Sequence, residues 1–258
     1  MSAPLRLIRD GVIGARRNIA MTAAIGELRA KCMAPDTLRI YRYRRSVLMG
    51  RRESTEAVIN RRECQRRGIE IARRVTGGGT VYMAPGVLAW DLVLRRPPGS
   101  DLAKSSARIG ESVAGMLVGL GFPASFQAPG NVLVNGMKVA GSAGSFDGMI
   151  LTLQGALLVD ADLGEMMAVL KGQGGVAAAP AVATLRVLAG RPIGIGYLAS
   201  SLATCVATSV ERTTAPNMIA GIELHLARTL YDQEIGSDAF VFDDGESPDL
   251  PQAAETAA

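Results

Sequence analysis

The chain has 258 residues, of which 48% are hydrophobic and 20% are charged, a balance that excludes a disordered chain and is typical of a folded enzyme. It contains no run of about 18 uncharged apolar residues and no secretory signal, so we expect neither a membrane span nor export. The three cysteines lack disulfide and metal-ligand spacing, which indicates reduced thiols in a cytoplasmic protein without a metal site.

Positive charge is concentrated in the first part of the chain. Residues 1–74 contain 17 Arg and one Lys against seven acidic residues. This segment predicts an anionic partner, such as a nucleotide or an acidic protein, although a solvated arginine-rich surface fits the same pattern. We expect no nucleic-acid partner, because the aromatic residues that would stack on bases make up only 4% of the chain.

The predicted elements follow in chain order. Asn18 is a candidate cap for a helix that ends near Lys31, and Ser54 for a second helix that ends near Arg67. Alternating residues predict two short strands within residues 37–50. Further strands are expected at 69–71, 81–82, 88–94 and 149–159, a hairpin at 131–141, and helices at 101–120, 161–171, 196–211 and 217–231. Strands grouped between helices predict an α+β fold with a mixed, largely antiparallel sheet, and make a Rossmann fold a poor candidate.

A glycine run at residues 77–79 follows the basic pair Arg73 and Arg74. Without Cβ atoms, this backbone can approach a ligand closely and direct successive N–H groups at an anion. The two arginines could bind a carboxylate or a phosphate. The run matches neither the Walker pattern nor GxGxxG, and a flexible turn beside solvated arginines is the alternative.

Lys138 is one of only four lysines, against 24 arginines, and it follows the predicted Asn135–Gly136 turn. Where arginine is so preferred, a lysine indicates that a compact point charge is needed. Such an ammonium could polarise a carbonyl and stabilise the developing oxyanion. The alternative is a solvent-facing lysine on a strand.

Residues 73–82, Arg-Arg-Val-Thr-Gly-Gly-Gly-Thr-Val-Tyr, resemble the signature of the lipoate–protein ligase A family, Arg-Arg-x-Ser-Gly-Gly-Gly-Ala-Val-Phe/Tyr. Residues 131–143 are similar to the second block of the family, which ends in Gly-Lys-Lys-Ile-x-Gly-Ser-Ala. Residues 154–158 are similar to the third block, His-Gly-Thr-Leu-Leu. Met83, Val132 and Gln154 stand where the family has His, Asp and His.

The resemblance implies the fold shared by lipoate and biotin ligases. It implies an enzyme that uses ATP and Mg²⁺ to activate lipoate or octanoate as an acyl-adenylate and joins the acyl group to a lysine of a carrier protein. Lys138 would be the catalytic residue. The residues implied to line the acyl-adenylate site are Arg73, Arg74, Thr76, Gly77, Gly78, Gly79, Thr80, Val81, Asn131, Gly141, Ser142 and Ala143. The implied partner is an acidic lipoyl carrier, either a lipoyl domain or a protein like the glycine-cleavage H protein, and we expect the enzyme to be a monomer.

Two alternatives remain open. Related octanoyltransferases form an acyl-cysteine, but the corresponding position here is Ser125, and Cys32, Cys64 and Cys205 stand outside the motifs, which favours adenylate chemistry. The chain would otherwise be a non-catalytic protein that binds a carrier domain. His225, the only histidine in the chain, is interpreted as structural, and its solitude excludes a multi-His metal site.

The expected organisation has three parts. Residues 1–171 form the catalytic core that binds the acyl-adenylate. Residues 172–242 contain two predicted helices and are either a reduced version of the small accessory domain of the family or a helical extension of the core. Residues 243–258 are acidic and contain proline, which predicts a disordered tail.

Overall fold

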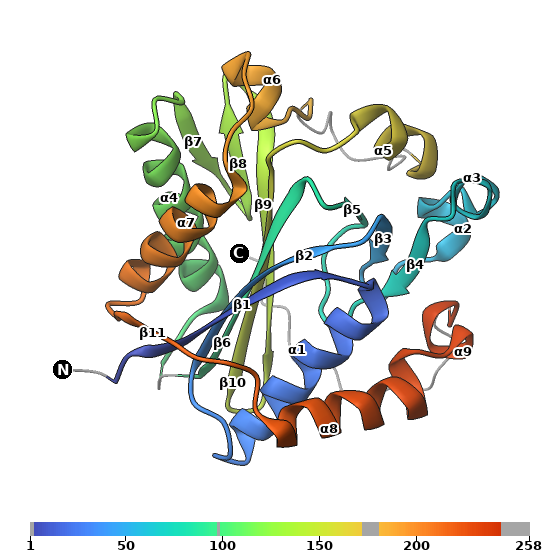
Figure 1. The fold of residues 1–258 in the computed structure, drawn as a ribbon, viewed down its shortest axis with the longest axis vertical. Coiled ribbons are helices and arrows are strands. Elements are labelled where there is room, and N and C mark those ends of the chain that lie inside the picture. The colour runs from blue at the N-terminus through green and yellow to red at the C-terminus, as the bar shows by residue number, and fades with distance from the viewer. Residues whose placement is uncertain (1–2, 97–98, 172–180, 244–258) are drawn as a thin grey trace.

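The computed structural model describes residues 3–96, 99–171 and 181–243. Within these residues the strands form one sheet of eight, in the order β11-β1-β2-β6-β10-β9-β8-β7, and one of three, in the order β4-β3-β5 (Figure 1). The strands of the large sheet are β1 (Leu5–Ile13), β2 (Thr37–Tyr43), β6 (Val87–Arg95), β7 (Ala124–Gln127), β8 (Asn131–Val134), β9 (Met137–Asp147), β10 (Ile150–Leu158) and β11 (Thr214–Pro216).

In the large sheet β1 runs parallel to both of its neighbours, β2 and β11, and the other neighbouring strands are antiparallel. This mixed, largely antiparallel sheet packed with helices confirms the predicted α+β fold class. The predicted turn between β8 and β9 is also confirmed. Asn135 and Gly136 have φ angles of 51° and 74°, the left-handed values that a two-residue hairpin turn of this kind requires.

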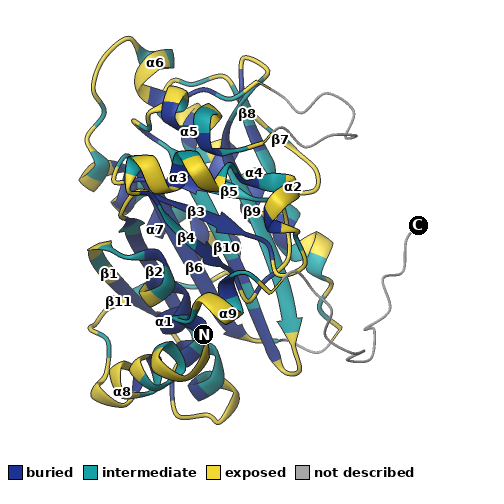
Figure 2. Ribbon diagram, turned by 90° about the vertical axis from the view of Figure 1, so that its right-hand side faces the viewer, coloured by how far each residue is buried: buried dark blue, intermediate teal, exposed yellow. Residues whose placement is uncertain are grey.

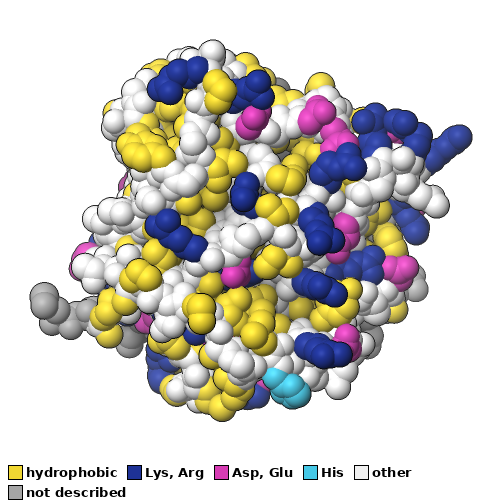
Figure 3. All heavy atoms as spheres, viewed as in Figure 1, with side chains coloured by type: hydrophobic (Ala, Val, Ile, Leu, Met, Phe, Trp, Pro, Cys, Tyr) yellow, Lys and Arg dark blue, Asp and Glu magenta, His cyan; other side chains and the backbone are white. Residues whose placement is uncertain are grey.

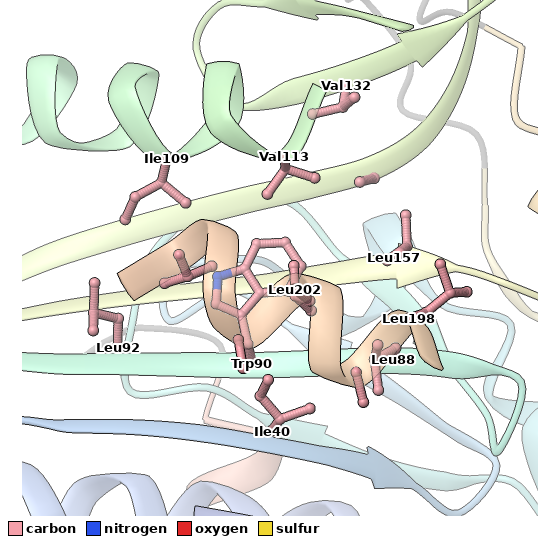
Figure 4. Close-up of a cluster of buried hydrophobic side chains, with 14 of the residues drawn as sticks. Ile40, Leu88, Trp90, Leu92, Ile109, Val113, Val132, Leu157, Leu198 and Leu202 are labelled. Atoms are coloured by element: carbon pink, nitrogen blue, oxygen red, sulfur yellow. The ribbon is translucent and has the colours of Figure 1, made fainter. Parts of the chain in front are cut away.

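Helices cover both faces of the large sheet, so the interior has two layers (Figures 1 and 2). On one face lie α4 (Leu102–Gly119) and α7 (Ile195–Ser209), and Trp90 of β6 lies among apolar side chains of both helices (Figure 4). On the opposite face lie α1 (Ala15–Ala30) and α8 (Gly221–Leu230). Because successive strand residues alternate between faces, the neighbours of Trp90, Ala89 and Asp91, face the α1 side.

The small sheet consists of β3 (Ser46–Met49), β4 (Glu70–Arg73) and β5 (Val81–Met83). Short helices lie around it, namely α2 (Thr55–Val58), α3 (Arg61–Arg67), α5 (Leu163–Val169) and α9 (Asp238–Val241). The loop between β4 and β5 carries the glycine run, so the small sheet sets the position of the run.

The described residues after 181 fold onto the same core. Val182 forms a bridge with Lys138 beside β9, and α6 (Leu185–Ala189) follows. β11 extends the large sheet, and a π-helical turn (Tyr231–Ile235) connects α8 to α9. Residues 172–180 and 244–258, which include nearly all of the predicted tail, lie outside the described residues.

The predicted start of the first helix is wrong. α1 begins at Ala15, because the Glu70 carboxylate accepts hydrogen bonds from the backbone N–H groups of Ala15 (2.7 Å) and Arg16 (3.1 Å). A residue from a distant strand therefore caps the helix, and Asn18 is fully buried inside it.

The predicted helix from Ser54 to Arg67 is interrupted. Ile59 lies between α2 and α3 and forms a bridge with Leu170, where its side chain is completely buried. In the described part of the chain, no helix has the length and hydropathy needed to span a bilayer.

Candidate active site

The glycine run meets strand β9 of the large sheet at Gly78. Gly78 has a φ of 90°, in the left-handed region that favours glycine. A Cβ atom added there would lie 3.1 Å from the Cβ of Ala143 on β9. The first and second sequence blocks, some 60 residues apart in the chain, are therefore in direct contact.

Arg74 holds the carbonyl groups of the run. Its Nη2 donates to the carbonyl oxygens of Gly77 (2.9 Å) and Gly79 (3.1 Å), and its Nη1 donates to Leu48 O (3.1 Å). Burial lowers the pKa of this guanidinium. Two carbonyls of the run point to Arg74, and the N–H groups of the exposed residues 77–79 have no acceptor among the described residues. Three successive N–H groups of this kind can act as a row of donors for an anion.

Arg73 is buried and contacts backbone rather than open space. Its Nε donates to Val241 O (2.9 Å), and its Nη1 donates to Glu53 O (2.7 Å) and Arg51 O (3.2 Å). These bonds attach the loop before α2 to the end of α9. The Arg73 side chain therefore binds backbone carbonyls instead of offering the expected bidentate contact to an anionic ligand. Its membership of the site remains a prediction.

The loop at residues 50–53 packs against the other side of the run. A Cβ on Gly50 would lie 1.9 Å from Gly78 O, so only glycine fits there. Glu53 Oε2 accepts from Gly50 N (2.8 Å) and from Thr80 Oγ1 (2.5 Å). Thr80 thus ties the run to this loop, while Val81 begins β5 and pairs with Leu48.

Lys138 lies over Gly141 on the same face of β9. The register with β8 shifts by one residue between Val132 and Leu133, and this irregularity lets Lys138 point to the same side as Gly141, three residues later. A Cβ on Gly141 would lie 3.0 Å from Lys138 Cε and 3.1 Å from Nζ. Burial lowers the pKa of the Lys138 ammonium, which has no acidic partner among the described residues.

The remaining predicted site residues lie on both faces of β9. Gly141 and Ala143 share the face of Lys138, and Asn131 pairs with Gly141 across the hairpin. The Ser142 side chain points to the opposite face, and the backbone N–H of Ser142 donates to Gly130 O at 2.8 Å. The structure thus brings Lys138, Gly141, Ala143 and the run together, whereas the Ser142 side chain lies on the other side of the sheet.

A buried polar row, in which Gln154 is half-buried, lies beneath the run and was missed by the sequence analysis. Thr76 Oγ1 donates to Gln154 Oε1 (2.8 Å), and Gln154 Nε2 donates to Asp91 Oδ1 (2.8 Å). Asp91 also accepts from Tyr41 (2.9 Å) and lies 3.8 Å from Arg39 Nη1. Burial raises the pKa of Asp91, which the Arg39 guanidinium opposes. The signal in the sequence was a charged residue between apolar neighbours in each of two strands, Arg39 between Leu38 and Ile40 and Asp91 between Trp90 and Leu92.

Two of the three residues that differ from the family blocks, Met83 and Val132, lie in the hydrophobic core. Met83 and Val132 are each 2% exposed and pack in separate apolar clusters, so neither side chain faces the run. The third, Gln154, belongs to the buried polar row.

Two surface hollows, of about 420 and 570 Å³, lie beside α1. They share Arg17 and Tyr231, and neither is lined by a residue of the glycine run or of β9. They are therefore separate from this site.

Residues 14–207 match the family described as the lipoyl protein ligase A/B catalytic domain. Lipoate-protein ligase A subunit 1 of Thermoplasma acidophilum is 32% identical over 144 residues, which are 52% of this chain and 55% of that protein. The chain thus spans about half the length of this curated relative.

Three solved structures share the fold over nearly the whole chain. The bi-partite lipoate protein ligase of Thermoplasma acidophilum, described with its E2 lipoyl domain, has a TM-score of 0.83 at 23% identity and covers 96% of this chain and 100% of that one. A putative lipoate protein ligase of the same organism with bound lipoic acid has a TM-score of 0.80 at 25% identity, and lipoate-protein ligase A bound with ATP has 0.80 at 24%. Each of these two covers 93% of this chain and 99% of its own. The matched residues 14–207 include the run, Lys138 and Gln154, and the chain belongs to the lipoyl protein ligase A/B catalytic-domain family.

Proposed function

We propose that the chain is a lipoate–protein ligase, which uses ATP and Mg²⁺ to activate lipoate or octanoate as the acyl-adenylate and transfers the acyl group to a lysine of a lipoyl carrier protein. One observation carries the proposal. The donor row of residues 77–79 touches β9 at Ala143, and the Lys138 ammonium lies over Gly141 on the same face. Residues two apart on a strand are separated by about 7 Å. An acyl–phosphate anhydride, with its carbonyl and its phosphate, fits such a spacing.

The proposed reaction has two steps. A carboxylate oxygen of the acid attacks the α-phosphorus of ATP, the acyl–phosphate bond forms, and pyrophosphate leaves. The amine of the carrier lysine then attacks the acyl carbonyl, an amide forms, and AMP leaves while the amine gives up its protons to solvent. Both steps place negative charge on oxygen atoms at the reacting centre.

The residues of this chain supply complementary charge. The N–H groups of residues 77–79 would hold phosphate oxygens, since Arg74 keeps their carbonyls turned away. Lys138 would stabilise the developing charge on the carbonyl and phosphate oxygens. Because no carboxylate among the described residues pairs with Lys138, its charge is available to the substrate.

Mg²⁺ would enter with the nucleotide. The described residues contain no cluster of three His, Cys, Asp or Glu side chains that could hold a metal ion. Mg²⁺ usually keeps several waters and takes substrate phosphates together with one or two carboxylates. Glu53, whose Oε2 contacts Gly50 and Thr80 beside the run, is the carboxylate we propose for this contact.

The choice of ATP and lipoate is supported by the family comparisons, since one similar structure is described with ATP and another with lipoic acid. An ATP-independent transfer through an acyl-cysteine has less support. Burial raises the pKa of Cys64 to about 11 and that of Cys205 to about 12, which opposes thiolate formation. Cys32 is exposed and follows the C-terminal end of α1, whereas the Glu70-capped N-terminal end of α1 adjoins the small sheet. A helix of 16 residues is about 24 Å long, which separates Cys32 from that end.

The proposed partner is an acidic lipoyl domain. Several exposed arginines around the small sheet and α2 make no salt bridge with another described residue. Figures 1 and 3 have the same viewpoint, and the dark blue groups at the upper right of Figure 3 lie where Figure 1 draws these elements. These arginines include Arg44, Arg51, Arg52 and Arg62. Such a surface would attract an acidic carrier and orient it toward the run.

The decisive experiment supplies free lipoate and Mg-ATP without a carrier and measures pyrophosphate release and acyl-AMP. A ligase forms both, because activation precedes transfer. A variant with all three cysteines changed to Ser should retain this reaction and should then modify an acidic lipoyl domain, which intact mass would show. A folded triple variant without activity, together with transfer from octanoyl thioester in the absence of ATP, would overturn the proposal in favour of the transferase. Binding of the lipoyl domain with no acyl transfer from either donor would favour a non-catalytic binding protein.

A further inference from the structure

A register row of four residues crosses the large sheet beneath the glycine run. Arg39 of β2 pairs with Asp91 of β6, Asp91 pairs with Gln154 of β10, and Gln154 pairs with Ala143 of β9. Paired residues in neighbouring strands point to the same face. The row therefore ends at Ala143, the residue that Gly78 touches.

The hydrogen bonds of this row have a fixed direction. Asp91 is buried, and its carboxylate oxygens only accept: Oδ1 accepts from Gln154 and Tyr41, and Oδ2 accepts from Thr22. Gln154 must therefore present its amide nitrogen to Asp91 and its carbonyl oxygen to Thr76. With the amide reversed, two oxygen acceptors would face each other in the interior, which is strongly unfavourable.

Arg39 fixes the charge at the other end of the row. Arg39 is 1% exposed. Its Nε donates to Asp10 Oδ2 at 2.6 Å, and its Nη2 donates to Asn18 Oδ1 at 2.6 Å. Its Nη1 has no hydrogen-bond partner in the described part of the chain and lies 3.8 Å from Asp91 Oδ2. The guanidinium stabilises the ionised Asp91, and so it stabilises the form that orients Gln154.

Thr76 is the first fixed point before the glycines. Its side chain is 2% exposed, whereas residues 77–79 are exposed. A chain of three glycines has no side chains to hold it in place, so its position depends on the anchors at its two ends. Thr76 is held to β10 by Gln154, and Thr80 is held to the loop at residues 50–53 by Glu53.

We infer that Asp91 and Gln154 are positioning residues, which hold the glycine run at a fixed distance from the strand that carries Lys138 by orienting the Thr76 hydrogen bond. The inference rests on the proposed function for its effect on the ligand. β10, which carries Gln154, is the direct neighbour of β9, which carries Lys138. Loss of the tether therefore changes the alignment of the N–H row with the ammonium.

The test reverses the polarity of the Asp91–Gln154 bond. At a pH where both groups are ionised, Gln154→Glu replaces the nitrogen that donates to Asp91 by a carboxylate oxygen, and repulsion between the two carboxylates moves residue 154 from the position in which it holds Thr76. Adding Asp91→Asn restores the position of residue 154. The Asn amide nitrogen, in place of Oδ1, can donate to the introduced carboxylate and to Tyr41. The Asn oxygen can still accept from Thr22. Tyr41 stays satisfied because its hydroxyl lies 3.0 Å from that of Tyr43 and can donate to it. Thr22→Val is the matched control, because it removes a buried bond to Asp91 Oδ2 and leaves the Gln154 bond intact.

Two readouts are taken for each variant: hydrogen exchange of the Arg51 amide in the free protein, which donates to Thr76 O at 3.1 Å and so reports the position of Thr76, and the Kd for a non-hydrolysable acyl-adenylate. We expect Gln154→Glu to accelerate exchange and to weaken binding about tenfold or more. The double variant should exchange within about twofold of the wild-type rate. Its log Kd should recover at least half of the change that Gln154→Glu causes. Thr22→Val should lower Tm without changing exchange of the Arg51 amide.

The inference is overturned if the double variant exchanges as fast as Gln154→Glu, or if Thr22→Val accelerates exchange to the same extent. A wild-type protein that binds no acyl-adenylate would overturn the proposed function. In that case the exchange data still decide whether the row holds the run, because they are measured without ligand.

Discussion

Replacement of Lys138 by Ala is the most direct perturbation of the proposed chemistry. The side chain is half-buried over Gly141, with no acidic partner among the described residues. At an effective dielectric constant of about 20, unit charges about 4 Å apart interact by about 4 kcal/mol. This value is at the upper end of the about 2.7–4 kcal/mol, or about 10²–10³ in rate, that loss of one oxyanion-stabilising donor costs. We therefore expect the single-turnover rate constant for pyrophosphate release to fall about 10²–10³-fold.

The assay follows pyrophosphate release under single-turnover conditions with lipoate and Mg-ATP. Lys104→Ala is the matched control, since Lys104 is an exposed lysine near the start of α4 and should leave the rate unchanged. Lys138→Arg should recover little of the rate, because a planar guanidinium does not fit the space above Gly141 that the compact ammonium occupies.

The pH dependence gives a second signature of the same cation. Burial lowers the pKa of Lys138, so the folded protein loses this proton at a lower pH than an exposed lysine would. The wild-type rate should decline on the alkaline side as the pH rises through that pKa, and the Lys138→Arg residual rate should not. If Lys138→Ala retains the wild-type rate, or if its alkaline decline is the same as that of the wild type, the assigned role of the ammonium is wrong.

Three further outcomes are expected from the geometry. Gly78→Val should abolish acyl-adenylate binding and leave the circular dichroism spectrum nearly unchanged, because φ is 90° and the added Cβ would lie 3.1 Å from the Cβ of Ala143. Unchanged affinity in a calorimetric titration would exclude the proposed contact. Gly155→Ala should lower stability by about 1–3 kcal/mol or more through overpacking, since its Cβ would lie 1.9 Å from the Trp90 ring, and thermal unfolding should show a lower Tm. The association rate with an acidic lipoyl domain should fall as salt rises toward 0.15 M, where the Debye length is about 8 Å, and a salt-independent rate in stopped flow would mean that the arginines do not steer the carrier.

Local patterns in the sequence were sufficient to predict the elements whose signals are local. The Asn135–Gly136 turn has a strong turn signal, and the amphipathic segment at 101–120 is helical as α4. The α+β class followed from the grouping of strands and helices. Strands β1, β7 and β11 were missed. β7 and β11 have only four and three residues, and both β1 and β11 are ordered by pairing with strands far away in the sequence.

Contacts between distant residues could not be predicted in the same way. Glu70 caps α1 from another strand, so the sequence around Asn18 gave the wrong start. The arginine pair before the run was predicted to bind an anion, but both guanidiniums donate to backbone carbonyls. Nothing in a local pattern distinguishes an arginine that binds a ligand from one that binds the backbone, because both roles need the same planar donor group.

The arginine contacts explain how a run of three glycines can serve as a binding element. Such a run loses more conformational entropy on ordering than any other triplet, and a ligand that had to order it would bind weakly. Here the ordering is already present in the free protein: Arg74 binds two carbonyls of the run, Thr76 is tied to Gln154, and Thr80 is tied to Glu53. Each of these bonds holds a carbonyl or a flanking residue and leaves the N–H groups of residues 77–79 without an acceptor among the described residues. The run loses this conformational entropy during folding, where the buried contacts of the small sheet offset the cost. Ligand binding therefore does not have to order the run, and the affinity of its N–H groups for an anion is not reduced.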